Sequence, residues 1–120
     1  MKSKHIKLGA AAAALMLAFG CKSPHVDVTV VNRTGDEVRL LEVDYPSASF
    51  GADKLAAGAT LRYRVALQGR SVLKVQYTTP GKTQRQATGP AVTEGQSGRL
   101  EIDLLPDGKA EFHPELQPGK

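Results

Sequence analysis

Apolar and polar residues alternate along four short stretches of the chain after residue 25. A period of two residues is typical of a β-strand with one buried face and one solvent-exposed face. The apolar positions are Val26, Val28 and Val30; Leu61, Tyr63, Val65 and Leu67; Leu73, Val75 and Tyr77; and Leu100, Ile102 and Leu104. Glycine, proline and asparagine lie between these stretches, where they favour turns. The pattern predicts short antiparallel strands with these side chains pointing inward.

Other segments have weaker patterns. Val38–Tyr45 is expected to be a strand, and the slip in its alternation at Leu40-Leu41 indicates either a β-bulge or burial on both faces. Ser47–Gly58 fits an edge strand and loop better than a short helix. Lys82–Ser97 is polar, which makes it the candidate for a mobile or binding loop, with a solvated connector or weak hairpin as the simpler interpretation. Ala110–His113 is expected to be a last short strand.

These elements predict an all-β fold in a single domain. About six or seven short strands at roughly ten-residue spacing are typical of a small antiparallel β-sandwich, immunoglobulin-like or transthyretin-like, or of a small barrel. The cysteine and tryptophan of a true immunoglobulin domain are missing from residues 26–113, so only the architecture is predicted. The segment 114–120 is expected to be a frayed tail.

The N-terminal pattern is different, because it is apolar without alternation. Lys2, Lys4 and Lys7 precede thirteen uncharged residues, Leu8–Gly20. A stable membrane-spanning helix needs about 20 apolar residues, so a permanent span is the weaker interpretation. A basic start and a short apolar run predict a helical secretory signal peptide over residues 1–20.

The end of this signal matches a family pattern. Leu17-Ala18-Phe19-Gly20-Cys21 resembles the lipobox of bacterial lipoproteins, although Ala18 stands where that family most often has leucine. The resemblance implies cleavage between Gly20 and Cys21 and a diacylglyceryl group on the Cys21 sulfur. An ordinary signal peptide is the alternative, since Ala18-Phe19-Gly20 also fits the small-x-small rule. Lipidation is favoured because Cys21 is the only cysteine, and an unpaired thiol is unusual in an exported protein.

Residues 21–25 are then the lipidated cysteine and a short tether. The four residues Lys22–His25 span at most about 13 to 14 Å, so the domain is expected to lie close to the membrane surface. Two or three acyl chains, as the resemblance implies, hold a protein firmly. Lys22, rather than aspartate, follows the cysteine. By the same resemblance this favours the periplasmic side of the outer membrane in a cell that has two membranes.

The charge of the chain changes when the signal is removed. The formal charge is +4, but three of the sixteen Lys and Arg residues lie in the signal and all twelve acidic residues follow it. The mature chain therefore has thirteen basic and twelve acidic side chains, a net charge of +1. Without a basic cluster, nucleic-acid binding is not expected.

Metal binding would need clustered histidines, cysteines or carboxylates. His25 and His113 lie near opposite ends of the mature chain, so a site that combines them is conceivable but is not predicted. Glu101 and Asp103 share one strand face, as a carboxylate pair or half of a calcium site does. Cross-strand ion pairs with the outward side chains of Arg62 and Arg64 are the simpler expectation. The sequence therefore predicts no metal ion and no cofactor.

No catalytic set can be assembled either. Gly95-Gln96-Ser97-Gly98 has the wrong final spacing for a nucleophile elbow and lies in an expected loop. Tyr45 is the single tyrosine expected to be exposed, which is too little for a sugar-binding platform.

The sequence thus favours a lipid-anchored protein of the cell envelope that is not an enzyme. Its sandwich is expected to act as a binding or structural module, contacting a protein partner through a loop or a free strand edge. The alternative is an accessory ligand-binding component of an envelope enzyme or transport system, and a hydrolase is the third possibility.

Overall fold

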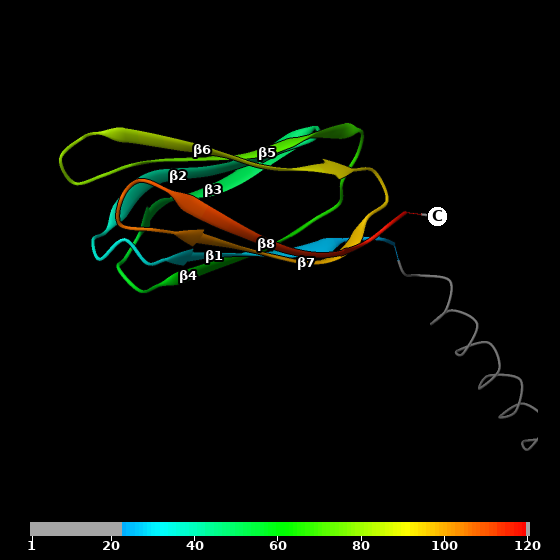
Figure 1. The fold of residues 1–120 in the computed structure, drawn as a ribbon, viewed down its shortest axis with the longest axis horizontal. Coiled ribbons are helices and arrows are strands. Elements are labelled where there is room, and N and C mark those ends of the chain that lie inside the picture. Colours follow the sequence, from blue (N-terminus) through cyan, green and yellow to red (C-terminus); the bar gives the residue numbers. More distant parts are fainter. Residues whose placement is uncertain (1–22, 120) are drawn as a thin grey trace, which may run out of the picture.

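The computed structural model describes residues 23–119, which form eight β-strands (Figure 1). The strands are β1 (Val26–Asn32), β2 (Val38–Tyr45), β3 (Ala48–Leu55), β4 (Thr60–Val65), β5 (Arg70–Thr78), β6 (Gln84–Thr93), β7 (Ser97–Leu104) and β8 (Ala110–Gln117). They form two four-stranded sheets, with the orders β4-β1-β7-β8 and β3-β2-β5-β6. The predicted all-β sandwich is confirmed. In this part of the chain no helix is long and apolar enough to cross a membrane.

One strand pair departs from the antiparallel expectation. Within residues 23–119, five of the six strand pairings are antiparallel, but β1 and β7 are parallel, with Val28 opposite Leu100 and Val30 opposite Ile102. These strands are distant in sequence, and the connection from β6 brings the chain across to the other sheet before β7 begins. Alternation indicates which side chains face inward but does not encode strand direction, so the parallel pair could not be predicted.

The core lies between the two sheets and follows the predicted alternation closely. Its most buried members from the first sheet are Val26, Val28, Val30, Val65, Leu100, Ile102 and Leu104, and those from the second are Val38, Leu41, Val43, Leu73, Val75, Tyr77 and Val92. Burying one such aliphatic side chain contributes about 1.5–3 kcal/mol. With no disulfide in this part of the chain, the packing of these side chains is the main source of stability.

Of the two interpretations of the slip in β2, a β-bulge or burial on both faces, the structure shows the bulge. The pairing of β2 with β5 shifts register between Arg39 and Glu42, and Leu40 adopts a positive φ of 51° with its side chain 66% exposed. This conformation turns Leu40 to solvent and returns Leu41 to the core. Gly51 of β3 faces the bulge, and a Cβ atom there would overlap the carbonyl oxygen of Leu41. Glycine is therefore required at this close backbone approach.

The prediction of a loop over Lys82–Ser97 is wrong. Most of this segment is β6, a ten-residue strand at the edge of its sheet and paired with β5. Its alternation is weak because small residues face inward: Gly89 lies against the Phe112 ring of β8, and a Cβ at Gly89 would come within 2.6 Å of that ring. An edge strand also tolerates Pro90, which lacks an N–H group.

The expected frayed tail from residue 114 is also wrong in part. The strand β8 continues to Gln117, with Pro114 opposite Leu100 and Leu116 packed against the core. Pro114 suggested a strand end, but β8 is an edge strand, where a residue without an N–H group costs little.

Tyr63 is the exception among the predicted inward residues. It lies opposite Val28 on the inner face of β4, but β4 is an edge strand and the ring is 49% exposed. The ring stacks on Phe50 of β3 with 4.7 Å between centroids and 10° between planes. This aromatic pair covers one open flank between the sheets.

A buried polar side chain, Asn32, lies at one end of the sandwich. Its Nδ2 donates to the carbonyl oxygens of Asp36, Leu55 and Ala56 at 2.8, 2.9 and 3.1 Å. Its Oδ1 accepts from the backbone N–H of Thr34 at 3.1 Å and from the Thr34 hydroxyl at 2.7 Å. One side chain thus joins the β1–β2 turn to the β3–β4 turn.

Replacing Asn32 with alanine should lower the free energy of unfolding by about 2–4 kcal/mol, because buried carbonyls lose their donor at a cost of about 1–3 kcal/mol each. Urea denaturation measures this change. Gln86→Ala, an exposed substitution on β6, is the control and should stay within about 0.5 kcal/mol of the wild type. Equal stability of the two variants would contradict the structural role of Asn32.

Candidate functional site

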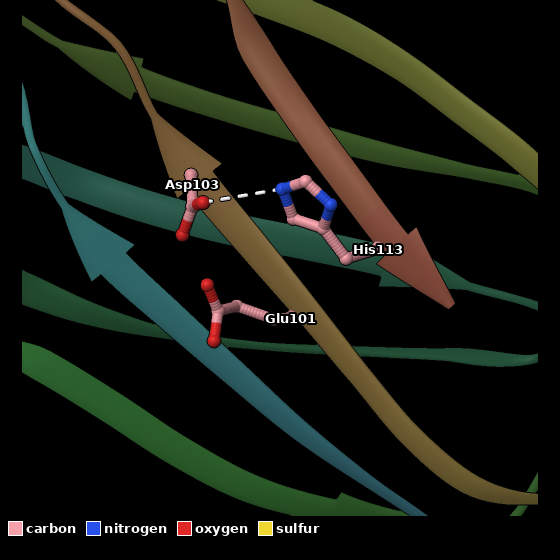
Figure 2. Close-up of side chains that lie close together, drawn as sticks. All are labelled: Glu101, Asp103 and His113. Atoms are coloured by element: carbon pink, nitrogen blue, oxygen red, sulfur yellow. Dashed lines mark ion pairs between the residues drawn. The ribbon is translucent and has the colours of Figure 1, made fainter. Parts of the chain in front are cut away.

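The densest group of metal-ligating side chains among residues 23–119 lies on the outer face of the β4-β1-β7-β8 sheet (Figure 2). Because Leu100, Ile102 and Leu104 point into the core, the intervening Glu101 and Asp103 point out from β7. The antiparallel register places His113 of β8 directly opposite Glu101. The same register brings residues ten to twelve apart in sequence onto one small patch.

The three side chains lie close enough to share one bound atom. The Nε2 atom of His113 is 3.2 Å from Oδ2 of Asp103, the contact drawn in Figure 2. One ligand atom from each of Glu101, Asp103 and His113 lies within 4.8 Å of the others. Glu111, which faces Asp103 across the ladder, adds a further carboxylate with Oε1 3.8 Å from His113 Nε2.

The positive partner of these acids is Arg33, which directly follows β1. Its Nε lies 3.4 Å from Oδ1 of Asp103, and its Nη2 lies 4.0 Å from Oε2 of Glu101. The backbone N–H of Arg33 donates to the carbonyl of Leu104 at 2.8 Å, which fixes the residue beside β7.

The expected ion pairs of Glu101 and Asp103 with Arg62 and Arg64 are wrong. The strand β1 lies between β4, which holds both arginines, and β7. Arg64 instead pairs with Asp27 of β1, with Nε 3.0 Å from Oδ1. Strand order, which alternation does not encode, decides the partner.

Asp103 is the unusual member of the group because it is nearly buried. Its side chain is 9% exposed, covered by Arg33 and His113, while Glu101 and His113 are half exposed. Among the described residues, its Oδ1 has no hydrogen-bond partner, since the Arg33 contact lacks hydrogen-bond geometry. A buried carboxylate oxygen without a donor is costly and calls for an explanation.

The close carboxylates also change the acidity of Glu101. Its pKa is raised above the usual 4.5, first because its protonated form hydrogen-bonds Asp103 and next because the Asp103 charge repels its ionised form. Arg33 and His113 oppose this shift in pKa without cancelling it. Net repulsion therefore remains between the two acids at neutral pH.

A shallow groove of about 440 Å³ continues from the patch toward the other end of the sheet. Thr29, Arg62 and Arg99 line it beside Glu101 and His113. Its rim contains side chains of both charges. The arrangement suits binding of a cation at the carboxylate end and of a polar group along the groove.

The other candidate residues lie apart from this patch. The His25 ring is 4.0 Å from the Asp27 carboxylate. Thr29 is the β1 residue opposite Glu101, and His25 precedes Thr29 by four positions, which is about 13 Å of strand. The structure thus does not join the two histidines. Ser97 begins β7 opposite Gln117, which differs from the strand–turn–helix of a nucleophile elbow. Gly20 and Cys21 lie outside the described residues.

Sequence reasoning paired Glu101 with Asp103 but considered His113 apart from them, and it missed Arg33 and Glu111. The usable signal was the Pro106-Asp107-Gly108 turn. A hairpin through that turn places the strand of Glu101 and Asp103 against the strand of His113.

Comparison with known proteins supports the fold alone. No protein-family model matches the chain, and a search of curated proteins finds no match. A solved structure, the NMR structure of a protein from Eubacterium rectale, is similar with a TM-score of 0.55. The sequences are 12% identical, and the match covers 76% of this chain and 88% of that chain.

Replacing Glu101 with glutamine should raise the melting temperature at pH 7 more than at pH 4, measured with a chelator present. A raised pKa means that the folded state holds the Glu101 proton more tightly than the unfolded chain does. Its contribution to stability is therefore present below pH 4.5 and is lost as pH rises through the folded-state pKa. The neutral glutamine removes that loss.

Glu115→Gln is the matched control, because Glu115 attracts Arg99 at 3.2 Å. It should bring no gain at pH 7. The opposite result is a change in melting temperature, variant minus wild type, that is smaller at pH 7 than at pH 4. It would show that attraction of Glu101 to Arg33 outweighs its repulsion from Asp103.

Proposed function

We propose that this chain is a lipid-anchored protein of the bacterial cell envelope whose β-sandwich acts as a non-catalytic binding or structural module. The observation that carries the proposal is Leu17-Ala18-Phe19-Gly20-Cys21, which resembles a lipobox and is followed by the first strand at Val26. In a cell with two membranes, the periplasmic side of the outer membrane is the proposed location.

The start of the domain supports a close attachment. The carbonyl oxygen of His25 accepts a hydrogen bond from the backbone N–H of Gly98 at 3.1 Å, so His25 is already held by the sheet. Only Lys22–Pro24 then separates Cys21 from the folded domain, about 10 Å of extended chain. With Cys21 in the membrane, the end of the sandwich that holds the β6–β7 turn lies nearest the lipid. The β1–β2 turn and the β5–β6 hairpin lie at the far end (Figure 1).

The strand edges support a binding role. Among residues 23–119, the outer edges of β3, β4, β6 and β8 have no further strand beside them. The longest is β6, whose ten residues are mostly exposed. A free edge offers backbone N–H and C=O groups to an added strand from a partner protein. We therefore propose β6, rather than a loop, as the contact for an envelope partner.

An accessory ligand-binding role is the second candidate. The groove beside Glu101 and His113 favours it, because the groove has polar side chains of both charges within one concave surface.

Intact mass spectrometry of the protein extracted from membranes with detergent tests the anchor. The expected mass is that of residues 21–120 plus a diacylglyceryl group, with or without an N-acyl chain. The variant Cys21→Ser should lack the lipid mass, and the cleaved, membrane-bound form should disappear. Lys22→Ser is the matched control and should keep the lipid.

A bare mass in the soluble fraction, unchanged by Cys21→Ser, would overturn the lipid anchor. It would indicate an ordinary secreted domain with a free thiol at its N-terminus. Co-purification of a stoichiometric protein that is lost when β6 edge residues are replaced by proline would support the module role.

A further inference from the structure

The geometry around Asp103 and His113 matches the inner shell of a transition-metal site. Ligands bound at 2.0–2.2 Å in a tetrahedron lie about 3.3–3.6 Å from one another. The Asp103 Oδ2 to His113 Nε2 separation of 3.2 Å is just below this range. The Glu101 side chain is half exposed, and one of its ligand atoms already lies within 4.8 Å of those of Asp103 and His113. Glu111, also exposed, is in reach as a fourth ligand.

The second observation is the buried oxygen of Asp103. Its side chain is more than nine-tenths buried, and Oδ1 receives no hydrogen bond within residues 23–119. The Asp103 side chain lies on the outer face, where it contacts His113 (Figure 2) and Arg33. An ion-pair patch without a ligand has no need to bury an acceptor that lacks a donor. A metal ion bound by both carboxylate oxygens of Asp103 would satisfy Oδ1 as well as Oδ2.

The charge balance of the patch also favours a cation. Glu101, Asp103 and Glu111 contribute three negative charges within one patch, and Arg33 contributes one positive charge. The Arg33 contact is loose: 3.4 Å exceeds the 2.7–2.9 Å of a charge-assisted hydrogen bond, and the Arg33 side chain is 55% exposed. Arg33 is thus able to swing into solvent and leave its place to an ion.

We propose that Glu101, Asp103 and His113 form a binding site for a divalent transition-metal ion of the zinc type. One imidazole with two or three carboxylates suits Zn²⁺ and its neighbours in the series. Calcium takes six to eight oxygen ligands and has no use for an imidazole, so it is the wrong ion for this set. Three protein ligands leave a position open for water or for a group of a partner molecule.

The test is a titration of the metal-stripped full-length chain with zinc chloride, followed by isothermal calorimetry and by NMR of the imidazole nitrogens. All proteins have the Cys21→Ser substitution, so that the thiol does not bind zinc. One saturable site is expected, with a shift of the His113 resonances and none for His25. Calcium chloride at the same concentration should neither bind there nor compete.

Variants at the exposed ligands separate the site from a plain ion-pair patch. Glu101→Gln and His113→Gln should each lower the zinc affinity at least about tenfold, the loss seen even for residues that only orient metal ligands. His25→Gln is the matched control, since His25 also lies beside an aspartate, and it should leave the affinity unchanged. Arg33→Ala should raise the affinity, because it removes the competing positive charge.

Because Glu101 and His113 are half exposed, these variants are expected to fold, and their melting temperatures without metal verify it. Absence of saturable zinc binding would overturn the proposal. So would binding that is lost with His25→Gln, or binding with equal affinity in all variants. Weaker binding in Arg33→Ala would show that the arginine supports the patch rather than competing with a cation.

Discussion

The carboxamide of Asn32 is the interaction on which one whole end of the sandwich depends. It joins two turns that the sequence separates by more than twenty residues, and it does so with hydrogen bonds made away from water. Arg33 follows it directly, and the backbone bond from Arg33 to Leu104 sets the guanidinium over Asp103. The backbone of Arg33 is therefore held beside β7 next to a buried amide that belongs to the fold, while its exposed side chain is free to move.

The core of the sandwich is filled differently at its centre and at its two flanks. In the β4-β1-β7-β8 sheet, the central strands β1 and β7 bury valine, leucine and isoleucine at every second position. At the flanks, where edge strands cannot bury both sides, an aromatic ring closes each gap: Phe50 stacked on Tyr63 at one, and Phe112 over Gly89 at the other. Rings are efficient here because one side chain covers a large area without a backbone neighbour.

Much of this fold was predictable from residues with a period of two, and the bulge at Leu40 was predictable from a local slip in that period. What alternation cannot specify is which strands become neighbours. That missing information explains the unexpected parallel β1–β7 pair, the Arg33 partner of Asp103 in place of Arg62 or Arg64, and the meeting of His113 with Glu101. The strand β6 was missed for another reason, because glycine and alanine on its inner face gave no apolar signal.

The central place of β1 would have a mechanical consequence under the proposed attachment at Cys21. Hydrogen bonds hold β1 on both sides, antiparallel to β4 and parallel to β7. Tension between a membrane anchor at Cys21 and a partner held at the far end would pull β1 along its own length. The ladder bonds lie across that direction, so the force is shared by both ladders at once instead of opening them one bond at a time. A first strand at an edge would peel, whereas β1, paired on both sides, would have to be sheared.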